Sequence, residues 1–363
     1  MKPVEIFDYL SNRVIGQEES LRYVSVAIFK HLQGDKYGNL LLIGNSGTGK
    51  TTIMRGIEAL YNEHDDFQEH RVVLIMNAST LATEEGAVDT SRLFHRLEER
   101  ARQVLGAGAS AEEIARAMER ATVCLDEIDK VSGIIGGKPY VTGINIQQAL
   151  LTLLEGERVL HRMTAISQAG VPENAAVWVD TGKMLFLCAG AFETLYDQVF
   201  QRVTSPKSGI KLPTTTTYIN GKIQIREYFT LRHHFRQEDL FDYGMQPQFL
   251  SRFDNAVILE DLTPGTLSRI FRVQDGVFSN SRSFFEKYGI ELEVTDAAVQ
   301  KIAEEAAKSS RIGARALKSV YGRIIKPFEF DPFSREEVQK NGGDLHKLTI
   351  DEKLVGEALK PAI

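Results

Sequence analysis

Two kinds of hydrophobic pattern alternate along roughly the first 260 residues. Short apolar runs, typical of buried strands, occupy 39–44, 71–79, 121–127 and 183–190. Other stretches repeat apolar residues every three or four positions, as amphipathic helices do: 21–32, 53–61, 91–105 and 110–119. Ser110 and Glu113 form a capping-box pattern at the start of the last one. Strands alternating with helices predict an α/β fold whose mostly parallel sheet is covered on both faces.

The pattern changes after residues 255–264, where helical spacing dominates. Apolar stripes predict one helix around 299–306 and another around 317–324, and a strand-like stretch follows at 346–351. A length of 363 residues fits about two domains. We therefore expect a large α/β domain over 1–263 and a small, helix-rich α+β domain over 264–363.

Composition narrows the class of protein. Hydrophobic residues make up 43% and charged residues 25%, an ordinary globular balance. A net charge of -6 argues against a protein that mainly coats nucleic acid. Two isolated cysteines, Cys124 and Cys188, predict no disulfide framework or zinc site and fit a cytoplasmic location. The opening residues lack the apolar core of a signal peptide, and no run is long enough to span a membrane.

A phosphate-binding loop lies between the first predicted strand and the helix at 53–61. Gly44 to Thr51 match the pattern G-x-x-x-x-G-K-[ST] in full. The glycines let backbone N–H groups point at phosphates, and the helix N-terminus adds partial positive charge. Lys50 is predicted to reach the outer phosphates and Thr51 to ligate Mg²⁺. The predicted nucleotide-binding residues of this loop are Gly44, Ser46, Gly47, Thr48, Gly49, Lys50, Thr51 and Thr52.

Two carboxylates follow the apolar strand at 121–127. Asp126 is expected to hold Mg²⁺, directly or through water, and Glu127 to activate the attacking water as general base. Ligands of open α/β sheets bind at the carboxyl ends of the strands, where both residues fall. An acidic helix cap is the alternative interpretation, but the neighbouring phosphate loop disfavours it. The pair predicts hydrolysis of ATP.

Seven sequence blocks then carry a resemblance to a known family. In order they are VIGQEES, LLIGNSGTGKTT, CLDEIDKV, INIQQALLTLLEG, KMLFLCAGAF, QEDLFDYGMQPQFLSRFD and RIGARALKSV. This order resembles the ClpX-type AAA+ unfoldase ATPases over about residues 10 to 355. Seven ordered blocks are much more specific than a phosphate loop alone.

The resemblance implies further site residues. Arg252 matches the arginine finger that stabilises charge on a neighbouring subunit's nucleotide. Arg315 matches the sensor arginine of the small domain, and it lies about 160° around its helix from Leu317, away from the apolar stripe. Val14 and Ile15 belong to the stretch Val14 to Gln17 that matches the adenine pocket. A solvated surface charge is the alternative for either arginine. The first sensor position, near Cys188, lacks the Asn or Thr common in AAA+ proteins, and its role stays open.

The chain departs from the family at the segments that contact protein. The pore stretch TEEGAVDT at 83–90 has no aromatic residue, which predicts a weaker grip. Tyr140, in the second pore loop, is a candidate for the missing aromatic residue. The favoured interpretation is that it is a plain turn residue. The family's amino-terminal zinc-binding domain is not expected here. Residues 205–229 replace the loop that carries Ile-Gly-Phe, and Asn220-Gly221 predicts a hairpin there.

We therefore expect an ATPase that uses ATP and Mg²⁺ and assembles as a hexameric ring. Its predicted function is to remodel or unfold a protein partner, without coupling to the ClpP peptidase and without a membrane. Nucleic acid is not the expected partner. The alternative is a nucleotide-dependent assembly platform, on DNA in one version, that threads no polypeptide. A phosphoryl-transfer kinase ranks third, because Glu127, Arg252 and Arg315 argue against it.

Overall fold

The computed structural model describes residues 1–360 except 36–37, 107, 167–171, 220–221, 228, 274–275, 334, 336 and 341–345. The chain forms two compact units. The first comprises Met1–Gly44 and Lys50–Leu259, and the second comprises Asn45–Gly49 and Glu260–Ile363. A functional division after residue 263 remains a prediction.

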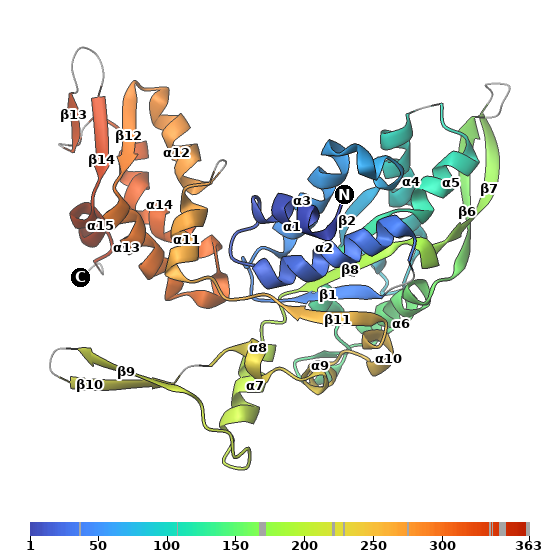
Figure 1. Cartoon of the computed structure of the whole chain (residues 1–363), viewed down its shortest axis with the longest axis horizontal. Helices are drawn as coiled ribbons and strands as arrows, with labels where there is room; N and C mark the ends of the chain where they lie inside the picture. The colour runs from blue at the N-terminus through green and yellow to red at the C-terminus, as the bar shows by residue number, and fades with distance from the viewer. Residues whose placement is uncertain are drawn as a thin grey trace. The chain divides into compact units, whose positions relative to one another are not determined.

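A five-stranded parallel sheet organises the first unit (Figure 1). Its spatial order is β11-β1-β8-β3-β2, and every neighbouring pair is parallel. The strands are β1 (Asn39–Ile43), β2 (Val73–Asn77), β3 (Thr122–Asp126), β8 (Leu185–Gly190) and β11 (Phe253–Ile258). Both β1 and β8 are buried along their whole length, as central strands of a covered sheet are. The four predicted strands and the α/β fold class are confirmed.

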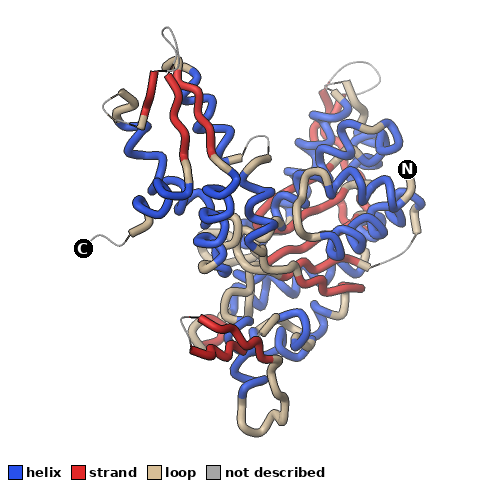
Figure 2. Tube along the Cα trace, turned by 60° about the vertical axis from the view of Figure 1, so that its left-hand side comes forward, coloured by secondary structure: helices blue, strands red, loops and turns tan. Residues whose placement is uncertain are grey.

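Each face of this sheet carries its own hydrophobic core, because successive strand residues point to opposite faces. Leu40 and Leu42 of β1 pack with α1 (Pro3–Ser11), α2 (Glu18–Gln33) and α3 (Lys50–Glu63). Leu41 and Ile43 pack with the other core layer, formed with α4 (Ser91–Leu105), α5 (Ala111–Glu119) and α6 (Val141–Glu155). Figures 1 and 2 show these strands lying between helices. Residues that alternate along the sequence thus fix two helical layers.

The capping box of α5 forms as predicted. The Ser110 backbone N–H donates to the Glu113 carboxylate at 2.8 Å, and the Ser110 hydroxyl accepts from the Glu113 backbone N–H at 3.3 Å. Shorter helices complete the first unit: α7 (Leu195–Thr204), α8 (Leu231–His234), α9 (Gln237–Tyr243) and α10 (Pro247–Leu250).

Among the described residues of the first unit, three antiparallel strand pairs lie outside the main sheet. They pair β4 (Ile134–Ile135) with β5 (Lys138–Pro139), β6 (Arg158–Ile166) with β7 (Pro172–Asp180), and β9 (Thr214–Ile219) with β10 (Lys222–Glu227). The hairpin predicted within 205–229 is confirmed, and its strands pair Tyr218 with Ile223 and Thr216 with Ile225. The Asn220-Gly221 turn lies outside the described residues. The β6–β7 hairpin was not predicted.

The second unit combines helices with a small sheet. Its helices are α11 (Pro264–Phe271), α12 (Val277–Glu286), α13 (Asp296–Ala307), α14 (Arg315–Phe330) and α15 (Glu352–Ala358). Strands β12 (Ile290–Val294), β14 (His346–Ile350) and β13 (Val338–Lys340) follow one another across the sheet. The predicted helices around 299–306 and 317–324 and the strand at 346–351 are confirmed. The alternating buried pattern of β12, with Ile290, Leu292 and Val294 inside, was overlooked in the sequence.

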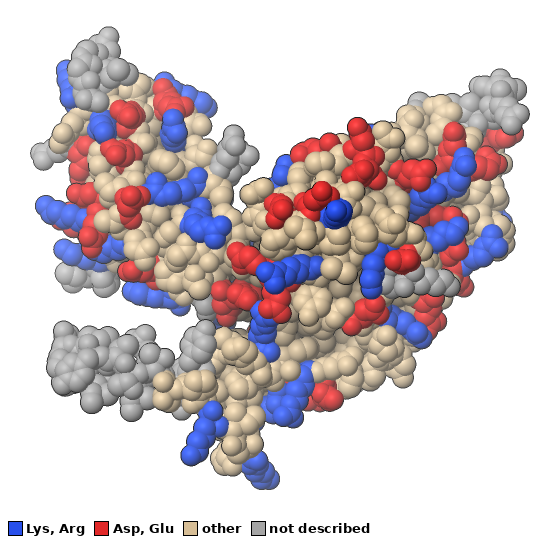
Figure 3. Space-filling view, in the orientation of Figure 1, with Lys and Arg blue, Asp and Glu red and all other residues tan. Residues whose placement is uncertain are grey.

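The described surface carries both signs of charge. On the face of the first unit seen in Figure 3, Lys and Arg are interspersed with Asp and Glu. Among the described helices, none combines the length and the apolar character that crossing a bilayer requires.

Candidate nucleotide site

The phosphate loop connects buried β1 to α3. Gly47 and Gly49 have φ angles of +74° and +110°, in the left-handed region that favours glycine. The Thr48 hydroxyl donates to the Asn45 carbonyl at 2.9 Å, which tightens the turn. Helix α3 begins at Lys50 and runs for 14 residues, so its unsatisfied N–H groups face the loop. The loop therefore has the backbone of an anion-binding helix start.

Lys50 is mostly enclosed, with only 8% of the residue exposed. Its ammonium donates to the Gly44 carbonyl at 2.6 Å. A charged amine this poorly hydrated is stabilised by such hydrogen bonds. Lys50 is thus a fixed positive charge beside the loop.

Thr51 and Asp126 are brought together from α3 and the end of β3. The Thr51 hydroxyl donates to one Asp126 carboxylate oxygen at 2.7 Å. Adjacent oxygen ligands of an octahedral Mg²⁺ lie about 2.9 Å apart, and Mg²⁺ prefers oxygen ligands. The hydroxyl and carboxylate therefore fit two neighbouring positions of a bound Mg²⁺.

Glu127 has an unusual backbone and two side-chain partners. Its φ of 57° is one of two positive values at non-glycine residues among those described. The Asn77 amide donates to one carboxylate oxygen at 3.0 Å, and Lys130 pairs with the other at 2.9 Å. Left-handed backbone at a non-glycine residue costs free energy and is kept where the surroundings enforce it. The carboxylate is thereby oriented at the carboxyl end of β3.

Asp129 fixes the turn that follows β8. Its carboxylate accepts from the Ala191 backbone N–H at 3.1 Å. Burial raises the pKa of Asp129, and the backbone N–H groups of the turn oppose that shift. Phe192 in this turn has the second positive φ, 49°. Cys188 is fully buried, and burial raises the pKa of its thiol, so it offers no charged group at the first sensor position.

In the second unit, loop residues meet the start of α14. The Arg315 guanidinium donates to the Ser46 hydroxyl at 2.7 Å, and the Ala314 backbone N–H donates to the Gly47 carbonyl at 3.0 Å. The Asn45 amide donates to Asp261 at 2.8 Å, and burial raises the pKa of that carboxyl. Arg315 is exposed, off the apolar face of its helix. The predicted sensor arginine therefore lies beside the phosphate loop, while its role stays a prediction.

Arg252 is placed differently. Its side chain and that of its ion-pair partner Glu155 are 42% and 44% exposed. Its backbone carbonyl accepts from the Asn39 amide at 3.2 Å. Among the described contacts, none joins Arg252 to Thr51 or Asp126. The structure of one chain therefore does not bring the predicted finger into its own Mg²⁺ site.

The predicted adenine-pocket residues lie between α1 and α2. Val14 is 3% exposed and belongs to the same core layer as α3. Ile15 is half-buried, and Gly16 has a φ of +80°. Val14 thus shares a core layer with the helix that begins at the phosphate loop, and the contact of this stretch with a base remains a prediction.

The two predicted pore loops have regular turns. Thr83 donates its backbone N–H to the Ala87 carbonyl at 2.7 Å, closing a tight turn at Gly86. In the second loop, Tyr140 is half-buried, whereas Ile135 and Val141 are 57% and 64% exposed. The second loop thus exposes aliphatic side chains more than its tyrosine.

Three site residues were missed in the sequence: Asn77, Lys130 and Asp129. Asn77 ends a predicted strand, and the parallel register pairs it with Asp126. Polar residues at the ends of neighbouring parallel strands meet at one edge of a sheet. That rule, applied to the stretch 71–79, would have found Asn77.

Family comparisons agree with this fold. Residues 35–256 match the model of the AAA domain (Cdc48 subfamily). Residues 262–346 match the C-terminal, D2-small domain, of ClpB protein.

Three similar proteins that cover almost the whole chain carry the name ATP-dependent Clp protease ATP-binding subunit ClpX or ClpX 2. The Porphyromonas gingivalis protein (strain ATCC 33277) is 28% identical over 377 residues, covering 97% of this chain and 84% of that protein. The Bacteroides thetaiotaomicron protein is 28% identical, with 96% and 80% covered. The protein named ClpX 2 of Wolinella succinogenes is also 28% identical, with 93% and 79% covered.

The parallel sheet, phosphate loop and acidic strand end define a nucleotide-hydrolysing protein of the phosphate-loop class. Within that class, the chain belongs to the AAA domain (Cdc48 subfamily) family and is a ClpX-like AAA+ ATPase. Its enzymatic activity is ATP hydrolysis.

Proposed function

We propose that this ATPase couples ATP hydrolysis to the remodelling or unfolding of a protein partner. The observation that carries the proposal is the grouping of Thr51, Asp126 and Glu127 at one strand end, with 2.7 Å between the first two. A carboxylate beside the Mg²⁺ ligands suits activation of water. The relatives are named as subunits of a protease, which supports a protein as the partner.

Within one subunit, each predicted residue receives a role. Backbone groups of Gly44, Ser46, Gly47, Thr48, Gly49 and Thr52 cradle the phosphates, with Lys50 on the outer ones. Thr51 and Asp126 hold Mg²⁺, which would neutralise phosphate charge when bound. Val14 and Ile15 contact adenine, and Arg315 senses the nucleotide from the small domain, taken as 264–363. The Arg315–Ser46 hydrogen bond of 2.7 Å supports the last assignment.

The working assembly is proposed to be a hexameric ring. An exposed ion pair such as Arg252–Glu155 stabilises a protein by at most about 1 kcal/mol, so Arg252 can exchange Glu155 for a stronger anion at little cost. The nucleotide phosphate of a neighbouring subunit is such an anion. Head-to-tail contacts that close produce rings, and Arg252 acting across them requires one.

The partner is proposed to be a protein other than the ClpP peptidase. The paired strands β9 and β10 occupy the segment where the family carries a docking loop. A paired hairpin is stiffer than a loop and presents a defined surface to one partner. The cytoplasm is the proposed location, in keeping with the buried free thiols of Cys124 and Cys188.

Unfolding of a tagged fluorescent protein tests the main proposal. Loss of fluorescence is expected with ATP and not with ADP, and Glu127→Gln serves as the hydrolysis-deficient control. Salt-dependent DNA binding that stimulates hydrolysis, without any unfolding, would favour the assembly platform instead.

Two further assays test the assembly and the partner. Mixing Arg252→Ala with Lys50→Ala subunits should restore part of the ATPase activity, because mixed interfaces pair an intact site with an intact finger. No restoration in assembled mixtures would exclude action in trans.

Replacing 214–227 by a Gly-Ser linker should preserve basal hydrolysis but remove its stimulation by the partner. Tight ClpP binding and ClpP-dependent degradation by the parent protein would refute the ClpP part.

A further inference from the structure

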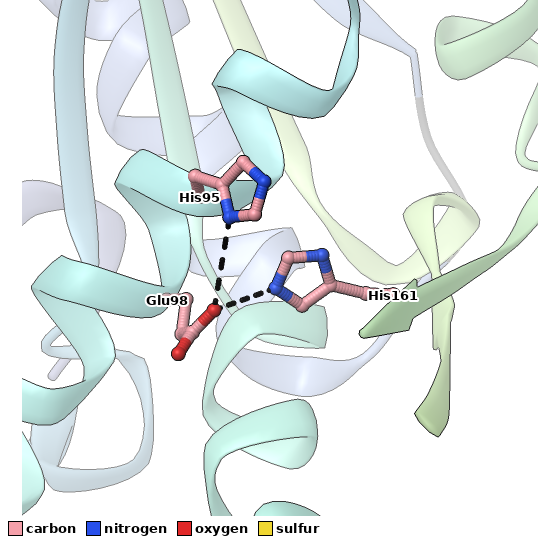
Figure 4. Close-up of side chains that lie close together, drawn as sticks. All are labelled: His95, Glu98 and His161. Carbon is pink, nitrogen blue, oxygen red and sulfur yellow. Dashed lines mark hydrogen bonds and ion pairs between the residues drawn. The ribbon is translucent and has the colours of Figure 1, made fainter. Parts of the chain in front are cut away.

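A cluster of two histidines and a glutamate lies outside the nucleotide site, between α4 and β6. His95 and Glu98 are three residues apart on one face of α4, and His161 projects from β6 (Figure 4). One ligand atom from each residue lies within 4.8 Å of the other two. Neither the sequence motifs nor the proposed function uses these residues.

The two oxygens of the Glu98 carboxylate have different neighbours. Oε1 accepts a hydrogen bond from Nε of Arg102 at 2.9 Å, and it lies 2.8 Å from Nη2 in the same ion pair. Oε2 lies 2.7 Å from Nε2 of His161 and 4.0 Å from Nδ1 of His95. Arg102 thus orients the carboxylate so that one oxygen converges with two ring nitrogens. A charged partner that fixes a ligand in this way is typical of the surroundings of metal sites.

We propose that His95, Glu98 and His161 form a binding site for a divalent late transition-metal ion of the Zn²⁺ class. Two imidazole nitrogens and one carboxylate oxygen are a donor set that Zn²⁺ accepts, whereas Mg²⁺ and Ca²⁺ prefer oxygen alone. The ligand set is therefore chemically distinct from the Thr51–Asp126 pair.

The distances require little rearrangement. Ligand atoms of a tetrahedral Zn²⁺ lie about 3.4 Å apart, since each bond is about 2.0–2.1 Å long. His161 is 5% exposed and packs against the buried ring of Phe94, so its position is fixed. The His95 side chain is 59% exposed, and its ring lies edge-on to that of His161 with 5.1 Å between the centroids. Solvent supplies the remaining ligand, which makes the ion exchangeable.

A bound ion would connect the β6–β7 hairpin to α4. A two-stranded hairpin is only marginally stable without packing, so a second attachment point matters for it. His161 lies opposite Val177 of β7 in the register. The metal is thus expected to slow the opening of β6 and leave the parallel sheet unaffected.

Metal titration of the whole protein tests the site. The protein is first stripped with a chelator and saturated with Mg²⁺-ADP, so that the nucleotide site is filled. Zn²⁺ is then titrated calorimetrically, and Co²⁺ provides visible absorption bands that report nitrogen ligation. One ion per chain is expected, together with slower amide hydrogen exchange at 158–166.

The variants separate this site from other metal-binding positions. His95→Ala should weaken Zn²⁺ binding by about 10-fold or more without harming the fold, because the side chain is exposed. Glu98→Gln should weaken it as well. His233→Ala removes another exposed histidine and should bind like the parent. No stoichiometric Zn²⁺ binding by the parent, or equal affinity in the parent and His95→Ala, would overturn the proposal.

Discussion

The carboxyl end of the parallel sheet and the β6–β7 hairpin differ in how firmly their side chains are held. At the sheet end, Lys50 and Asp126 each have a hydrogen-bond partner within 2.7 Å, and β1 is wholly buried. On the hairpin, the cross-strand neighbours Leu160 and Trp178 are 44% and 55% exposed. The side chains of the candidate nucleotide site are thus held by hydrogen bonds and packing, whereas the exposed side chains of the hairpin have few constraints.

This difference predicts which substitutions the folded chain tolerates. A change at the sheet end disturbs packing and chemistry together, so few residues are tolerated there. A change at an exposed position of the hairpin disturbs little of the folded chain. Substitutions should therefore have large effects at the sheet end and small effects at the exposed positions of the hairpin.

Lys50→Ala should have the largest effect. Losing a charged donor removes hydrogen bonds worth about 1.5–3 kcal/mol each, so two of them predict nucleotide affinity at least about 100-fold lower. Calorimetric titration with ATP would measure the loss. Lys353→Ala removes an exposed lysine elsewhere and should bind normally. Near-normal ATP affinity in Lys50→Ala would show that Lys50 does not contribute to nucleotide binding.

Glu127→Gln should separate binding from turnover. Loss of a general base lowers the rate about 10²–10⁴-fold, while the phosphate and Mg²⁺ contacts remain. Steady-state hydrolysis and ATP affinity measured on the same preparation would show the split. Lys130→Ala, which changes only a partner of Glu127, should lower turnover far less. Parent-like turnover in Glu127→Gln would show that another group activates the water.

His31 is buried on α2, and the pH dependence of stability tests how well the interior of the first unit excludes its charged form. Burial and the nearby His70 lower its pKa to about 3, while an unfolded histidine titrates near 6.5. The unfolded chain therefore binds more protons between pH 6.5 and 3, and stability falls as pH drops through this window. The loss at pH 5 is on the order of 2 kcal/mol.

His31→Gln should remove that part of the pH dependence. Glutamine retains a donor for the Arg120 carbonyl, which lies 3.1 Å from Nε2 of His31. Denaturant unfolding at pH 7 and pH 5 would compare the two proteins. Equal losses of stability in both would mean that His31 is protonated in the folded state.

Trp178→Ala should have the smallest effect. Its cross-strand contact with Leu160 is worth less than about 1 kcal/mol, and basal ATP hydrolysis should not change. The neighbouring Val179 is fully buried, so Val179→Ala should destabilise the fold by about 2 kcal/mol. Denaturant unfolding of both variants measures the contrast. A greater loss of stability in Trp178→Ala than in Val179→Ala would contradict this prediction.

Local patterns in the sequence predicted local structure well. The apolar run at 39–44, the Ser110 capping box and the 214–226 hairpin all depend on neighbouring residues, and all three are confirmed. The β6–β7 hairpin was not predicted. It is recognised from the pairing of its two strands, which match nine residues of β6 with nine of β7. The partners of Glu127 and the Glu155 partner of Arg252 come from distant elements, so their identity depends on strand order and helix placement.

At Glu127, which has a left-handed backbone, stability and turnover favour different residues. A glutamate with a φ of 57° carries a strain of about 1–2 kcal/mol that a glycine would not. Glu127→Gly is therefore expected to melt at a higher temperature than Glu127→Ala, although neither can activate water. If the two melted alike, the strain would be absent. The enzyme thus accepts reduced stability for turnover at this residue, and stability screens of this protein should select inactive substitutions there.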